Sequence, residues 1–137
     1  MSLDRFVSAQ RDTYAGALAE IRNGRKTRHW MWFVFPQIEG LGRSPNARYY
    51  GISGLAEARA YLADPVLGPR LVEISRALLA HSEHTAAEIL GDVDALKLRF
   101  CATLFDAAGG DDVFQQILDR FFQGGKCGAT LEMLNRH

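Results

Sequence analysis

The 137-residue chain has an ordinary globular composition, with 47% hydrophobic and 23% charged residues, and its 16 Lys and Arg balance 16 Asp and Glu. A chain of this length can bury one core, so we expect a single domain over residues 1–137. The absence of a net basic charge argues against nonspecific binding to nucleic acid or to an anionic membrane. No apolar run approaches the ~20 residues of a membrane span, and Asp4 stands where a signal peptide would be apolar. These features predict a cytoplasmic protein.

Cysteine and histidine patterns do not indicate a metal centre or a disulfide framework. The two cysteines, Cys101 and Cys127, lack the spacing of a zinc site, and we expect both to be reduced. Cys127 lies in a Gly-rich loop, which makes it the more reactive candidate. His81 and His84 are three residues apart without a third ligand nearby, which favours a solvated helix end. We therefore expect no metal and no cofactor.

The first predicted helix runs from about Leu3 to Asn23, where Asn23-Gly24 provides the left-handed stop typical of a helix C-terminus. Because Gln10 falls on the inward face of this helix, we expect its amide to bind backbone groups of a neighbouring loop. Five residues at near-helical spacing form that face: Phe6, Gln10, Tyr14, Ala17 and Ile21.

The aromatic segment Trp30 to Phe35 is compatible with either a short buried strand or a turn and a half of helix. Pro36 disfavours helix at Phe35. A lone strand would have no ladder partner, and no other convincing strand is present. Short helical turns are therefore the favoured interpretation.

Two further helices are expected in the middle of the chain, one over Leu55–Ala63 and one that starts after Asp64-Pro65 and ends near Ala80. Thr85 and Glu88 fit a capping box that opens a short turn. The buried face of the second helix is expected to hold four residues: Leu67, Leu71, Ile74 and Leu78.

The C-terminal third of the chain predicts three helices. A segment over residues 92–108 is apolar around much of its circumference, including Val93 and Leu96, and is expected to cross the middle of the domain. Asp111 and Asp112 begin the next helix, and a Gly-rich turn separates it from a last short helix over residues 129–135. The whole pattern predicts an all-α fold, a compact bundle of five or six main helices with short helical turns.

Several motifs in order along the chain resemble the bacterial domain-of-unknown-function 1810 family. The motifs are residues 6–10, GRKTRHWMWFVFPQIEGLGRS at 24–44, EARAYLADPVLGPRL at 57–71, Asp94 with Lys97, Leu104-Phe105, and FFQGG followed by Thr130-Leu131. The resemblance spans nearly the whole chain and implies an all-helical fold with no settled biochemical role. Some family members carry the label calpastatin, but such an inhibitor is disordered, whereas this composition supports a buried core.

The segment 25–50 is locally basic and aromatic around a Gly-Pro loop, a mixture that suits a planar anionic ligand. The alternative is that its aromatic residues fill the core while its cations are solvated. Lys97, on a mostly apolar helix, either pairs with Asp94 or lines a pocket that admits an anion. The candidate ligand-binding residues are Lys26, His29, Trp30, Trp32, Gln37, Arg43, Ser44, Arg70 and Lys97.

Three functions remain open at this point. The first is a binding or regulatory module for a small anionic or nucleotide-like ligand. The second is an enzyme that acts on a nucleotide or ADP-ribose-type metabolite, with His29 in proton transfer. The third is a protein-interaction module, which an exposed Trp-Tyr patch without a cavity would favour. We expect His29, Lys97 and the loop 40–44 to converge on one pocket.

Overall fold

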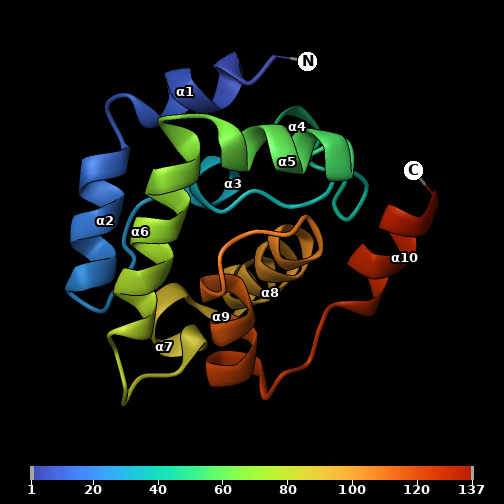
Figure 1. The fold of residues 1–137 in the computed structure, drawn as a ribbon. Helices are drawn as coiled ribbons and strands as arrows, with labels where there is room; N and C mark the ends of the chain where they lie inside the picture. Colours follow the sequence, from blue (N-terminus) through green and yellow to red (C-terminus); the bar gives the residue numbers. More distant parts are fainter. Residues whose placement is uncertain (1, 137) are drawn as a thin grey trace.

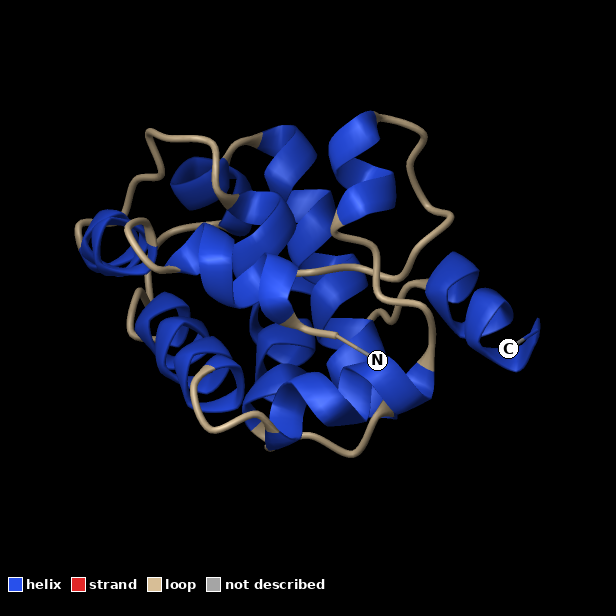
Figure 2. Ribbon diagram, turned by 90° about the horizontal axis from the view of Figure 1, so that it is seen from above, coloured by secondary structure: helices blue, strands red, loops and turns tan. Residues whose placement is uncertain are grey.

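The computed structural model describes residues 2–136, which form ten helices and no strand (Figures 1 and 2). An isolated parallel bridge joins Ile38 to Ile52. The helices are α1 (Asp4–Gln10), α2 (Tyr14–Arg22), α3 (Met31–Val34), α4 (Pro45–Tyr49), α5 (Leu55–Ala63), α6 (Leu67–Leu79), α7 (Ala86–Leu90), α8 (Asp92–Ala107), α9 (Val113–Phe122) and α10 (Gly128–Arg136).

The all-α prediction is confirmed, but the described residues form ten helices and not five or six. Part of the difference lies at the start, where the helix expected over Leu3–Asn23 is two helices, α1 and α2, joined by a turn at residues 11–13. Asp12 and Thr13 are residue types of low helix propensity, which favours a break there. The break lets α2 turn and descend beside α6 (Figure 1).

The inward faces predicted for the N-terminal region and for α6 are buried. Gln10 donates to the backbone oxygen of Phe33 at 2.7 Å and to the hydroxyl of Tyr61 at 3.0 Å. The first of these is the expected hydrogen bond between the Gln10 amide and a backbone group of a neighbouring segment. α6 buries its apolar stripe against α2, α5 and α9. The buried members of both stripes are Phe6, Gln10, Tyr14, Ala17, Ile21, Leu67, Leu71, Ile74 and Leu78.

α8 crosses the middle of the fold and packs on α5, α7, α9 and α10. Leu98 and Phe105 are fully buried on its inner side. The apolar side chains of its first turns are not part of this inner side, because Val93 is 67% and Leu96 53% exposed. The N-terminal part of α8 lies at the surface, and this places Asp94 and Lys97 between core and solvent.

The segment between α2 and α4 is helical at its aromatic centre, as predicted. α3 is one short turn, in which Phe35 N–H donates to the oxygen of Met31 at 3.0 Å. After Pro36 the chain extends and pairs briefly with residues near Ile52, which accounts for the isolated bridge. This stretch therefore runs from the core at Trp30 outward to α4 (Figure 1).

Candidate functional site

The loop that follows α2 is fixed by the buried carboxylate of Glu20. This carboxylate accepts hydrogen bonds from the backbone N–H groups of Thr27 at 2.7 Å and Arg28 at 3.1 Å. It also accepts from Arg28 Nε at 2.6 Å and from the indole Nε1 of Trp30 at 3.0 Å. Burial raises the pKa of Glu20, but the four hydrogen bonds outweigh burial and lower the pKa from 4.5 to about 2. Residues 27–30 are thereby held against α2.

Lys26 reaches from this loop to the first turn of α8. Its backbone N–H donates to the oxygen of Ile89 at 2.7 Å, which ties the loop to α7. Its ammonium lies 2.9 Å from Asp94 Oδ2 and donates to the oxygen of Arg28 at 2.5 Å. Only 7% of its side chain is exposed. The loop therefore places a nearly buried positive charge next to the first turn of α8.

Lys97 contacts the same carboxylate from the opposite side. Its ammonium lies 3.3 Å from Asp94 Oδ1, and its side chain is 15% exposed. The ammonium also sits 3.4 Å from the centre of the Trp32 ring, a cation–π contact. Two cations thus share one carboxylate beside an aromatic plane.

A small polar cavity lies at this junction. Its volume is about 60 Å³, the space of about two water molecules. The imidazole of His29, an exposed residue, lines it together with the two lysines. Two ammonium groups face one carboxylate, so the cavity carries an excess of positive charge. The complete lining is Lys26, His29, Met31, Trp32, Asp94 and Lys97.

Four of the nine predicted ligand-binding residues, Lys26, His29, Trp32 and Lys97, line this cavity. Lys97 fulfils both roles considered for it, because it pairs with Asp94 and also lines the cavity. Asp94 entered the sequence argument only as a salt-bridge partner of Lys97. Its position between two lysines depends on the contact between the loop at Lys26 and α8, which no local pattern reveals.

The other five predicted residues lie elsewhere. Trp30 is fully buried, and Gln37 is 5% exposed with Oε1 unbonded among the described residues. Arg43 and Ser44 are exposed, and the hydroxyl of Ser44 accepts from Ala47 N–H at 3.1 Å as the N-cap of α4. Arg70 lies 5.0 Å from the centre of the Tyr14 ring. The expectation that loop 40–44 joins His29 and Lys97 is wrong, since none of its residues lines the cavity.

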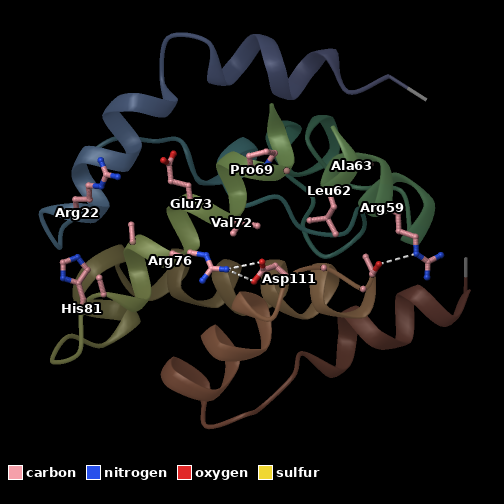
Figure 3. Close-up of a pocket in the computed structure, with 16 residues that line it drawn as sticks. Arg22, Arg59, Leu62, Ala63, Pro69, Val72, Glu73, Arg76, His81 and Asp111 are labelled. Atoms are coloured by element: carbon pink, nitrogen blue, oxygen red, sulfur yellow. Dashed lines mark hydrogen bonds and ion pairs between the residues drawn. The ribbon is translucent and has the colours of Figure 1, made fainter. Parts of the chain in front are cut away.

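A second and much larger hollow, about 1110 Å³ in volume, runs along α6 (Figure 3). Its walls come from α5, α6, the end of α2 and the turn at residues 108–111. This hollow was not expected from the sequence. Pro69 and Val72 of α6 line it, but Glu73 and Arg76 lie on the same side of the helix, so no apolar pattern marks this surface.

The described residues contain no group of three or more His, Cys, Asp or Glu placed to hold a metal ion. Both cysteines are free and buried, and burial raises the pKa of Cys101. Cys127 is 7% exposed against 1% for Cys101, and its sulfur accepts a hydrogen bond from Thr130 N–H, so its greater reactivity stays a prediction. Between residues 2 and 136 no helix combines the length and apolarity needed to cross a bilayer.

A family model described as "Protein of unknown function (DUF1810)" matches residues 1–134. The chain belongs to the DUF1810 family. Among solved structures, this DUF1810 chain is similar to the conserved hypothetical protein Rv1873 from Mycobacterium tuberculosis, with 45% identity and a TM-score of 0.95. The match covers 97% of this chain and 96% of that one. No curated protein matches the chain. The expected family and its helical fold are confirmed.

Proposed function

We propose that this DUF1810 protein is a single-domain binding module for a small anionic, nucleotide-like ligand. The observation that carries the proposal is the pair of ammonium groups on Lys26 and Lys97, which share the single carboxylate of Asp94 in a polar cavity. A partly buried cation without full compensation is costly, and a bound anion would supply the missing charge.

The size of the cavity restricts what enters it. A space of about two water molecules admits a phosphate or carboxylate group, but not a whole nucleotide. The rest of the ligand would lie outside, next to the exposed His29 and the partly exposed Trp32. Trp32 offers a ring for stacking, which suits a ligand that joins an anionic group to a planar one.

Thermal unfolding in the presence of inorganic phosphate, adenosine monophosphate and ADP-ribose tests the proposal, with uncharged adenosine as the control ligand. A ligand at about 100 times its dissociation constant should stabilise the protein by about 2.7 kcal/mol. Lys97→Met should remove that response. Lys126→Met is the matched control, because Lys126 is 45% exposed and pairs with Asp106 away from the cavity. No stabilisation by any anion, or an equal response of both variants, would contradict the proposal.

Catalysis is a second candidate, which the position of His29 favours. His29 lines the cavity beside the lysines and is exposed, and histidine is the side chain that most often acts in general acid–base catalysis. Product analysis after incubation with nucleotides and ADP-ribose separates the two candidates. Turnover that disappears in His29→Ala would establish the enzyme, and binding without turnover would establish the module.

A further inference from the structure

The hollow along α6 is an open groove, drawn in Figure 3, and it shares no lining residue with the lysine cavity. Its volume of about 1110 Å³ lies above the range of about 300–1,000 Å³ typical of small-molecule pockets. Pro69 in the first turn of α6 and Ala80, its C-cap, both line it, and at 1.5 Å per residue they are about 17 Å apart along the helix axis, or three helical turns. The groove therefore follows almost the whole length of one helix.

The floor of the groove is mainly apolar. Val72 and Ala77 of α6 line it, together with Ala80 just after α6, Leu62 of α5 and Ala108. Val72, Ala77 and Leu62 are partly exposed, and the exposed Glu73 and Arg76 share this side of α6 with them. An open groove with apolar side chains along its length suits an amphipathic helix.

The middle of the groove carries one ion pair and one further carboxylate. Arg76 Nη2 donates to Asp111 Oδ1 and Oδ2 at 3.1 and 3.2 Å (Figure 3). Glu73 accepts a hydrogen bond of 2.5 Å from the hydroxyl of Tyr14, which is neutral and leaves the negative charge of Glu73 in place. The centre of the groove therefore offers no uncompensated positive charge to acidic groups of an occupant.

The two ends differ from the centre, because each carries an arginine that forms no ion pair with a carboxylate of residues 2–136. Arg22 lies at one end near His81, and Arg59 at the other (Figure 3). Arg22 makes no hydrogen bond or ion pair within residues 2–136, and Arg59 makes a single long bond of 3.4 Å to the oxygen of Ala108. A complementary occupant is apolar in its middle and acidic at both ends.

We propose that this groove binds one amphipathic α-helix of a partner protein, about three turns long, with acidic residues at its two ends. A helix laid in an open groove presents apolar residues at i, i+3, i+4 and i+7 along one face, which matches the length and the floor described above. The acidic ends would pair with Arg22 and Arg59. This proposal is independent of ligand binding at the lysine cavity.

Two synthetic helical peptides of about 12 residues test the proposal. Both carry the same Leu and Ala stripe; one has Glu pairs at each end, and the other has Lys pairs at the same positions. Binding is followed by fluorescence anisotropy of labelled peptide with the full-length protein. We expect the acidic peptide to bind, and Arg22→Glu or Arg59→Glu to weaken it by about tenfold or more. The double variant should reverse the preference and bind the Lys peptide.

Arg48→Glu is the matched control, because Arg48 is exposed on α4 outside the groove. It should leave both affinities unchanged. Arg22→Gln and Arg59→Gln serve as neutral variants if charge reversal unfolds the protein, and they should lower the affinity for the acidic peptide. The proposal is overturned if the acidic peptide does not bind, or if both peptides bind equally. Two other outcomes would also overturn the proposal. If a straight-chain dicarboxylate binds more tightly and displaces the acidic peptide, the groove binds a small molecule. If the protein is a dimer that Arg59→Glu dissociates, the groove binds a second copy of the chain.

Discussion

Glu20 shows how one buried carboxylate organises the candidate site from a distance. It fixes residues 27–30, and through them it sets the position of Lys26 above Asp94. Trp30 is fully buried in the core, although the sequence placed it among the candidate ligand-binding residues. Its indole N–H donates a hydrogen bond to Glu20, on the preceding helix. The periodicity of the sequence does not indicate this pairing.

Replacing Glu20 with Gln should destabilise the protein in a pH-dependent way. The pKa of Glu20 is about 2 in the folded state against a usual 4.5, so its ionised form stabilises the fold above pH 4.5, and this contribution is lost as the pH falls towards 2. We expect Glu20→Gln to lower the free energy of unfolding by about 3 kcal/mol at neutral pH, as measured by urea denaturation. The gap between wild type and variant should close in acid. Glu132→Gln, at an exposed pair with Arg136, is the control and should change stability by no more than about 1 kcal/mol.

His29→Ala should separate ligand binding from folding. His29 is exposed and lines the cavity, so its loss removes a ligand contact without opening the core. We expect the thermal response to an anionic ligand to disappear, while the melting temperature of the free protein stays within a few degrees of wild type. A clear drop in the melting temperature of the free variant would instead show that His29 supports the fold.

At the scale of helices, local sequence signals predicted most elements well. The capping box of Thr85 and Glu88 is present, with both reciprocal hydrogen bonds, and the helix over Leu55–Ala63 has the predicted bounds. The break after Gln10 was missed, because the inward stripe continues across it in nearly perfect register. Periodicity reports which side chains are buried, but it does not report whether the axis of the helix turns between them.

Close contact between α5 and α6 depends on Gly68. A Cβ atom at this position would meet the oxygen of Leu62 at 2.1 Å, so the two helices would have to move apart. We expect Gly68→Ala to destabilise the protein by about 1–3 kcal/mol in chemical denaturation. Gly128→Ala is a matched control, since a Cβ at this position of α10 meets nothing within 4 Å. Equal stability of the two variants would contradict the packing described for α5 and α6.

For the whole molecule, the candidate site and the groove differ in how much of them the sequence could reveal. The lysine cavity draws four of its six lining residues from the basic and aromatic segment 25–50. Composition therefore indicated this segment, and only its contact with α8 was uncertain. The groove combines α2, α5, α6 and the turn at 108–111. None of these segments has an unusual composition, and their juxtaposition arises from tertiary packing alone.

The two thiols should be free but protected in the native protein. Cys101 is 1% and Cys127 7% exposed, and burial raises the pKa of Cys101. Because the thiolate is the reactive form, we expect slow labelling by a thiol reagent in the native state. After unfolding without a reductant, both thiols should react rapidly, which consumes two equivalents of the reagent per chain. Rapid labelling of the native protein, or no free thiol after unfolding, would contradict the burial or the redox state.

The central claim, an anion bound between Lys26 and Lys97, is tested most directly by the two tryptophan indole N–H signals in ¹⁵N-resolved NMR spectra. Trp32 contacts Lys97 in the cavity, whereas the indole of Trp30 is buried and donates to Glu20. Titration with adenosine monophosphate should shift the Trp32 signal saturably, leave the Trp30 signal in place, and produce no shift in Lys97→Met. A Trp32 signal that stays unmoved, or that moves equally in Lys97→Met, would contradict the claim.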